Sequence, residues 1–182
     1  MLTNNFKKIL FKYIFGFSTI GSDDNYPPSE FSDKPTLISI SGSNCPIDAT
    51  NQYVLRDIWY SARNSLSTLA TRSTDGLGYI ILGSGTTEPT PEDYRLESQI
   101  TTNLSCDNVS VSRNTTVKTY TATFSNSGTS PITVTEIGYV SRTGYGTNPI
   151  TYDDFLMDRT VLETPITIPA GESRTVTYEL SF

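Results

Sequence analysis

The part of the sequence with the most chemical potential is a glycine-rich loop over residues 83–98, GSGTTEPTPEDYRLES. Such a loop holds a phosphate when it ends in Gly-Lys-Ser/Thr and leads into a helix whose N-terminus faces the anion. This loop contains no lysine, and Glu88, Glu92 and Asp93 would repel an anion. The dinucleotide spacing G-x-G-x-x-G also fails, because residue 88 is a glutamate. We therefore expect the loop to bind no cofactor.

The residue types within the loop favour an architectural role. Gly83 and Gly85 allow the chain to turn tightly as it leaves an apolar run. Thr90 followed by Pro91 is typical of the start of a helical turn, with the threonine as the cap and the proline at the first position. We expect this turn to include Asp93 and to place Leu96 in the core directly after it.

The other candidate chemistry of the chain is carboxylate chemistry. Because the sequence has no histidine, it cannot contain a Ser-His or Cys-His nucleophile or a histidine-based zinc site. A glycosidase needs a matched pair of carboxylates, and nothing in the sequence selects such a pair. The acidic pair Asp153–Asp154 is a conceivable cation site, but ordinary solvated turn acids are the better interpretation. We expect a protein that is not an enzyme and holds no metal.

Charge and cysteine content restrict the partners further. The net charge is −6 and no basic stripe is present, so the sequence does not predict nucleic-acid binding. Cys45 and Cys106 lack C-x-x-C spacing, and they form either one disulfide or two buried thiols, of which the second is favoured. No apolar run is long enough to predict a membrane-spanning helix.

The first 20 residues form an amphipathic and cationic segment. Lysines separate apolar residues that recur at helical spacing. One hypothesis is an anchor (residues 1–20) that docks on a partner protein or a membrane surface; the other is a helix that folds back on its own domain. We favour docking, because residues 21–35 are polar, acidic and proline-bearing, as in a linker. The docking residues would be Phe6, Ile9, Leu10, Tyr13, Ile14 and Phe17.

Residues 36–182 are expected to form a mainly β domain: an antiparallel, jelly-roll-like β-sandwich with the N-terminal helical extension and one further helix. Apolar and hydroxyl residues alternate in several runs, as in strands with one buried face. The expected helix lies within residues 51–71, where a strand is the alternative. The expected strands are residues 36–41, 79–82, 108–112, 118–125, 132–140, 155–162, 166–168 and 173–182.

Two groups of motifs carry a resemblance to a known class of protein. The first is GSGTTEP at residues 83–89 with Asp93 and Leu96; the second combines TEIG at residues 135–138 with a PAGES turn at residues 169–173. Together they resemble small β-sandwich virion proteins of tailed bacteriophages, over roughly residues 79–182. That resemblance implies a structural role with no catalytic residues. Glu136 is then either a carboxylate at the rim of the sheet that accepts backbone N–H bonds or a solvated outward residue.

The sequence thus leads to two functional hypotheses. The favoured one is a non-enzymatic structural component of a phage particle, present in many copies and in contact with portal, tail or capsid proteins. The alternative is a receptor- or glycan-binding module of a phage or bacterial surface, because eleven tyrosines and one tryptophan could stack on sugars. The expected location is the virion.

Overall fold

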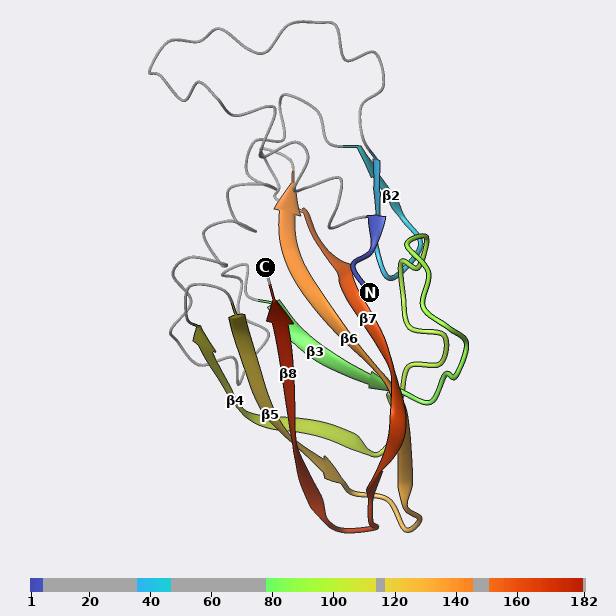
Figure 1. The fold of residues 1–182 in the computed structure, drawn as a ribbon, viewed down its shortest axis with the longest axis vertical. Coiled ribbons are helices and arrows are strands. Elements are labelled where there is room, and N and C mark those ends of the chain that lie inside the picture. The colour runs from blue at the N-terminus through green and yellow to red at the C-terminus, as the bar shows by residue number, and fades with distance from the viewer. Residues whose placement is uncertain (5–35, 47–77, 114–116, 146–150, 182) are drawn as a thin grey trace, which may run out of the picture.

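A computed structural model describes residues 1–4, 36–46, 78–113, 117–145 and 151–181 (Figure 1). These residues are mainly β and contain almost no helix; every strand pairing is antiparallel. The strands are β1 (Thr36–Ile38), β2 (Asn44–Pro46), β3 (Gly78–Gly83), β4 (Leu104–Arg113), β5 (Val117–Asn126), β6 (Ile132–Tyr145), β7 (Thr151–Ile168) and β8 (Ser173–Ser181).

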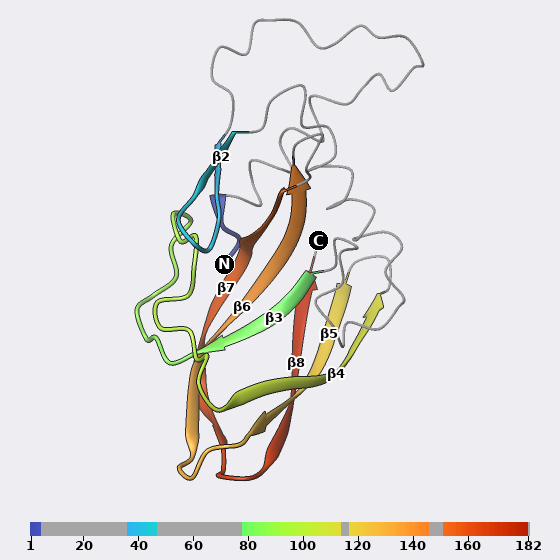
Figure 2. The ribbon, with the colours of Figure 1, turned by 180° about the vertical axis from the view of Figure 1, so that it is seen from behind.

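The strands pair into three sheets. One three-stranded sheet has the order β3-β6-β7, a second has the order β4-β5-β8, and β1 and β2 form a separate hairpin. The chain crosses from the second sheet to the first between β5 and β6 and returns between β7 and β8. Figures 1 and 2 show both crossings at the same end of the molecule.

Both three-stranded sheets contribute to one core because their strands alternate between two kinds of side chain. In β5, Tyr120, Ala122 and Phe124 are buried, while the threonines between them are half-buried. A single apolar cluster joins residues of β3, β5, β6, β7 and β8. Its members include Leu82, Tyr120, Phe124, Val134, Tyr139, Phe155, Met157, Ile168, Val176 and Tyr178.

The two strands expected at residues 155–162 and 166–168 are one strand, β7. Val161 lies opposite Glu136 and Ile166 lies opposite Val134, so four residues of β7 face one residue of β6. This bulge contains Pro165, which has no N–H to give to a ladder. The proline and its polar neighbours look like a break in sequence, but β7 continues past them.

The first four residues lie along the outer edge of β7. Leu2 forms a β-bridge with Asp158, and the N–H of Thr3 donates to the carbonyl of Met157 at 3.0 Å. The Thr3 side chain is fully buried, and its hydroxyl donates to the carbonyl of Leu156 at 2.7 Å. Residues 1–4 therefore cover part of the β7 edge.

Several expectations fall on residues that the structure does not describe. These are the proposed docking residues Phe6, Ile9, Leu10, Tyr13, Ile14 and Phe17, the linker at residues 21–35, and the helix at residues 51–71. Among the described residues, no helix is long and apolar enough to cross a membrane. Cys106 is an exposed free thiol in β4, so the expectation of two buried thiols is wrong for this residue.

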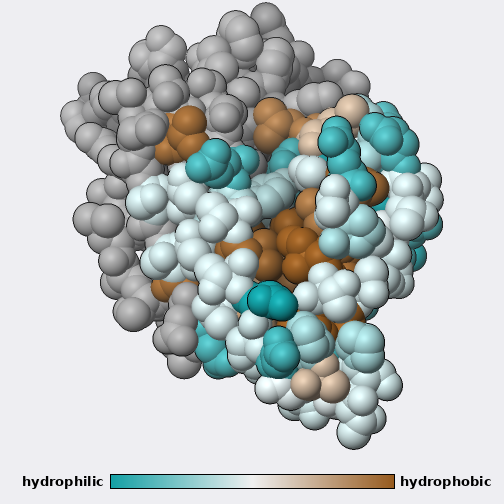
Figure 3. All heavy atoms as spheres, turned by 60° about the horizontal axis from the view of Figure 1, so that its bottom comes forward, coloured by the Kyte–Doolittle hydropathy of each residue, from teal (hydrophilic) through white to brown (hydrophobic). Residues whose placement is uncertain are grey.

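The surface at the end where the chain crosses between the sheets is mostly of intermediate hydropathy (Figure 3). Apolar atoms show near the centre of this view, between paler and hydrophilic residues. Hydrophobic residues packed against the core remain partly exposed. They are Ile100, Leu104, Val109, Ile132, Leu162 and Ile166.

Candidate functional site

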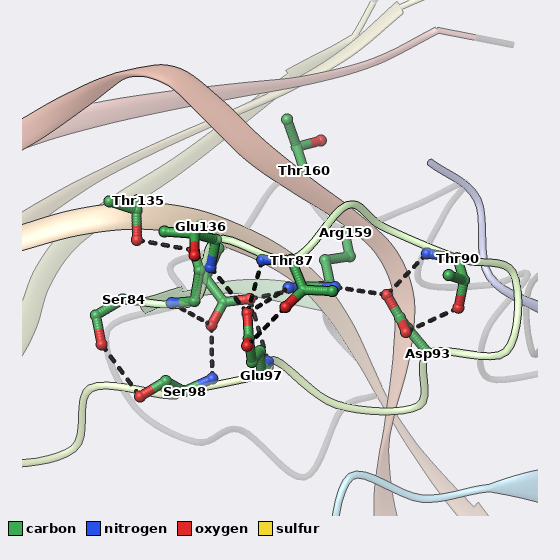
Figure 4. A network of polar contacts seen from close by, with 12 residues as sticks. Ser84, Thr87, Thr90, Asp93, Glu97, Ser98, Thr135, Glu136, Arg159 and Thr160 are labelled. Atoms are coloured by element: carbon green, nitrogen blue, oxygen red, sulfur yellow. Dashed lines mark hydrogen bonds and ion pairs between the residues drawn. The ribbon is translucent and has the colours of Figure 1, made fainter.

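The most organised polar feature of the described residues is centred on the carboxylate of Glu136, in β6 (Figure 4). Its side chain is 0% exposed. Oε1 accepts hydrogen bonds from the N–H groups of Gly85 at 3.0 Å and Ser98 at 2.7 Å, and Oε2 accepts one from the N–H of Glu97 at 3.1 Å. One carboxylate therefore binds both ends of the loop at residues 83–98. The alternative of a solvated outward residue is wrong.

Arg159, in β7, supplies the positive charge that a buried carboxylate requires. Its Nε lies 2.8 Å from Oε2 of Glu136, and a terminal nitrogen lies 2.7 Å from Oδ2 of Asp93. The other terminal nitrogen lies 3.6 Å from Oε2 of Glu97, which makes an ion pair but is too long for a hydrogen bond. Burial would lower the pKa of Arg159, but the bonds to Asp93 and Glu136 outweigh it and raise the pKa above its ordinary value.

Asp93 joins this arginine to the far side of the loop. Its carboxylate accepts hydrogen bonds from the N–H and the hydroxyl of Thr90, both at 3.0 Å. Partial burial would raise the pKa of Asp93, but the bonds from Arg159 and Thr90 hold it below its ordinary value. The expected helical turn with Thr90 as cap is not formed. Residues 91 and 92 make a simple turn, and the Asp93 carboxylate accepts the N–H of Thr90.

Glu97 closes the glycine-rich half of the loop. Its Oε2 accepts the N–H groups of Thr86 and Thr87, each at 2.8 Å, and its Oε1 accepts the hydroxyl of Thr87 at 2.7 Å. The bonds from Thr87 hold the pKa of this carboxyl below its ordinary value. Glu97 lies on the exposed surface, so its bonds shape the loop but are open to solvent.

The two glycines of the motif are required by close approach to the buried carboxylate. A Cβ on Gly83 would lie 2.4 Å from Oε1 of Glu136. A Cβ on Gly85 would lie 2.6 Å from the same oxygen and 2.6 Å from Cβ of Glu97. Contacts of this length are forbidden, so any other residue at either position would push the carboxylate away from its donors.

The apolar side of the loop is anchored by Leu96. This side chain is 3% exposed and packs with Ile81, Val140 and Leu156 in a second small core cluster. A Cβ on Gly138 would lie 2.8 Å from Leu156 and 2.9 Å from Leu96, so the glycine of the TEIG motif makes room for Leu96. Glu136 and Gly138 are two residues apart in β6, so the TEIG motif holds the polar and the apolar side of the loop on one face of the strand. Of the remaining loop residues, Pro91 is half-buried.

The chemistry available to this cluster is limited by its own bonding. The carboxylates of Glu136, Asp93 and Glu97 are occupied by backbone N–H groups and by Arg159. In the part of the chain that the structure describes, no group of three or more cysteines and carboxylates is placed to hold a metal ion. The cluster is arranged to fix a loop on a sheet.

Two further polar contacts lie inside the core. The hydroxyls of Tyr120 and Tyr139 are hydrogen-bonded at 2.8 Å, with ring centroids 4.8 Å apart. The hydroxyl of Tyr178 donates to the buried carboxylate of Asp158. Burial raises the pKa of all three tyrosines above its ordinary value. They therefore stay protonated and serve as hydrogen-bonding core residues.

Sequence reasoning identified some of these residues and missed others. It selected Gly83, Gly85, Pro91, Asp93 and Leu96 as the structural part of the loop. The structure places Gly83, Gly85 and Asp93 beside the Glu136–Arg159 pair, Leu96 in the second core cluster, and Pro91 half-buried in the turn. It gave no role to Arg159 or Glu97. Both resemble ordinary surface charges in sequence. The pairing of β6 with β7 brings Arg159 to Glu136, and the turn of the loop brings Glu97 to Thr86 and Thr87.

Comparisons with protein-family models, with curated proteins and with solved structures found no match to this chain.

Proposed function

We propose that this chain is a non-enzymatic structural component of a phage particle, docked through its N-terminal segment at the tail, neck or capsid surface. In this proposal the two three-stranded sheets are the layers of a jelly-roll-like β-sandwich that serves as a rigid body. The proposal begins from the resemblance of the sequence motifs to small virion proteins of tailed bacteriophages. It agrees with the mainly β, antiparallel architecture of the described residues.

The observation that carries the proposal is that the loop motif at residues 83–98 and the TEIG motif at residues 135–138 form one physical unit. Glu136 binds the backbone of Gly85 and Ser98, and Gly138 makes room for Leu96. Segments that are far apart in the chain therefore depend on each other: Glu136 is 51 residues from Gly85 and 38 residues from Ser98. The residues that carry the resemblance to small virion proteins therefore hold the fold together, and this supports a structural role.

The alternative, a glycan- or receptor-binding module, has less support. Sugar sites usually offer aromatic rings to stack on. Tyr120, Tyr139 and Tyr178 are turned into the core and bonded there. Trp59 and the N-terminal aromatics lie outside the described residues.

The test is the protein content of purified particles. Particles from a lysate of the host that carries this gene should be banded by density and examined by mass spectrometry. We expect the chain in the particle band, in several copies per particle. Its presence in the lysate together with its absence from the particle band would contradict the proposal.

The docking segment needs a variant that leaves residues 1–4 in place, because Thr3 is buried against β7. Replacing the apolar docking residues with serine meets this condition, whereas deleting residues 1–17 would also uncover β7. We expect this variant to be folded and missing from particles. Full occupancy in particles would refute docking through this segment. The residues to replace are Phe6, Ile9, Leu10, Tyr13, Ile14 and Phe17.

A further inference from the structure

The edges of the two three-stranded sheets differ in how well they are protected against the addition of another strand. The edge strands are β3 and β7 in one sheet and β4 and β8 in the other. An unprotected edge offers unpaired N–H and C=O groups to any extended chain, and proteins usually cover it, bend it or place charge or proline on it.

Three of the four edges carry such a device. On β3, the carbonyl of Leu82 accepts the N–H of Ile100 at 2.9 Å, and Gly83 forms a bridge with Gln99. The edge of β7 is covered by residues 1–4 and interrupted by the bulge that contains Pro165. The register of β4 shifts between Asp107 and Ser110, which is a bulge in an edge strand.

Among the described residues, strand β8 has no covering segment and no bulge, and charge is the only one of these devices that it carries. It pairs with β5 at nine consecutive positions, from Ser173 to Ser181, without a register shift. It contains no proline, and its only charged residues are Arg174 and Glu179. No described strand pairs with its other side. A strand of this length without a bulge presents a regular row of donors and acceptors.

We propose that β8 pairs with β8 of a second copy of this chain, antiparallel and about a two-fold axis at Thr177. The two sheets of order β4-β5-β8 would then join into one continuous sheet across the dimer. A two-fold contact is the commonest way in which identical chains associate. The inference concerns contacts between copies and does not depend on the assignment to a phage particle.

The sequence of β8 is self-complementary in this register. Thr177 faces its own copy, Thr175 faces Glu179, and Arg174 faces position 180, so no like charges are opposed. On the inner face, Val176 lies opposite Tyr178, an aromatic and β-branched pair of the kind that stabilises neighbouring strands.

The outer face of β8 continues a pattern that β5 and β8 already display. Ser125 and Ser173 are hydrogen-bonded at 2.8 Å, and Thr123 and Thr175 at 3.2 Å. The hydroxyl oxygens of Thr177 and Thr121 lie 3.5 Å apart. A Thr177 pair across the axis would add one more hydroxyl pair to this row, at the spacing of adjacent strands.

Disulfide trapping tests both the contact and its register. In a background with Cys45→Ser and Cys106→Ser, T177C places two thiols at opposed positions of an antiparallel pair. Opposed Cα atoms in such a pair are about 4.5–5.5 Å apart, within the range of a disulfide. Mild oxidation should convert most of T177C to a covalent dimer that reductant reverses.

Two variants on the same exposed face serve as controls. In T175C the two thiols are four residues apart along the paired strands, about 13 Å, which is too far for a disulfide. T123C lies on β5, one strand in from the edge. Both should form little covalent dimer on oxidation, with circular dichroism spectra like that of T177C. The proposal is overturned if T177C forms no more dimer than T123C, or if T175C forms the dimer instead.

Discussion

Oε2 of Glu136 and Nε of Arg159 lie 2.8 Å apart, with both side chains buried, at 0% and 3% exposure. The two residues come from neighbouring strands, where Arg159 lies opposite Gly138 and Glu136 opposite Val161. The pair therefore exists as soon as β6 and β7 are in register. It then presents carboxylate oxygens and guanidinium nitrogens to the loop at residues 83–98, so the sheet determines the shape of the loop.

Asp93→Asn should reveal an acid-dependent part of the stability. The pKa of Asp93 is lower in the folded chain than its ordinary value of 3.8, so its ionised form stabilises the fold above that value, and this contribution decreases as the pH falls toward the folded pKa. We expect D93N to lower the free energy of unfolding by about 1–2 kcal/mol at pH 7. The difference in the free energy of unfolding between D93N and the unsubstituted protein should become smaller below about pH 4.

Urea unfolding at pH 7 and at pH 3 measures that gap. Glu92→Gln is the matched control, because Glu92 is exposed and neighbours Asp93 in the same turn. E92Q should leave the unfolding midpoint unchanged at both pH values. A gap for D93N of equal size at pH 7 and pH 3 would show that the charge of Asp93 is not involved.

Gly85→Ala should cost more stability than Gly171→Ala. The added Cβ at residue 85 has to displace Glu136 or Glu97, so we expect a loss of about 3 kcal/mol, as when a buried ion pair is broken. At Gly171 nothing lies within 4 Å, but φ is +73°, so the loss should be about 1–2 kcal/mol from backbone strain alone. Thermal unfolding of both variants gives the comparison, and equal losses would argue against a close contact at Gly85.

The effects of removing the Tyr120 and Tyr139 hydroxyls should depend on each other, because the two groups share a buried hydrogen bond. Either substitution breaks the hydrogen bond between the two hydroxyls inside the core, so Y120F and Y139F should each lower the free energy of unfolding by about 1–2 kcal/mol. The double variant should lose less than the sum of the two. A double-mutant cycle from urea unfolding measures this coupling, and strict additivity would mean that the two hydroxyls do not interact.

Deletion of residues 1–4 should expose the β7 edge. The N–H of Arg159 donates to the carbonyl of Met1 at 3.1 Å, so it should lose its protection from hydrogen exchange in the deletion variant. Amides of β6 that pair with β7 should remain protected and serve as the internal control. Unchanged exchange at Arg159 would contradict the placement of residues 1–4 along this edge.

The sequence predicts the strands well where side chains alternate. The buried positions of β5 follow from the local pattern alone, because a strand with one wet face must repeat every two residues. The bulge in β7 could not be predicted in this way. Polar residues and Pro165 interrupt the pattern, and only the register with β6 shows that the strand continues.

The candidate site was only partly predictable for a similar reason. Gly83, Gly85 and Leu96 are recognisable because glycine and leucine have few alternative roles in such a loop. Arg159 is not, because a buried arginine and an exposed one look alike until its partners are placed. Thr90 and Asp93 show a third case: the residue types of a helix cap are present, but the carboxylate bonds to Arg159 and Thr90 and the chain makes only a turn.

Glu136 holds the loop on the sheet, so Glu136→Gln should release the loop. Glutamine keeps the shape but loses the charge that Arg159 needs, so unfolding in urea should show a loss of about 3–5 kcal/mol. Increased hydrogen exchange at the amides of Gly85 and Ser98 should accompany it. Glu163→Gln, at an exposed glutamate in the β7 bulge, should change neither quantity. An E136Q variant as stable as E163Q, with both loop amides still protected, would show that Glu136 does not hold the loop.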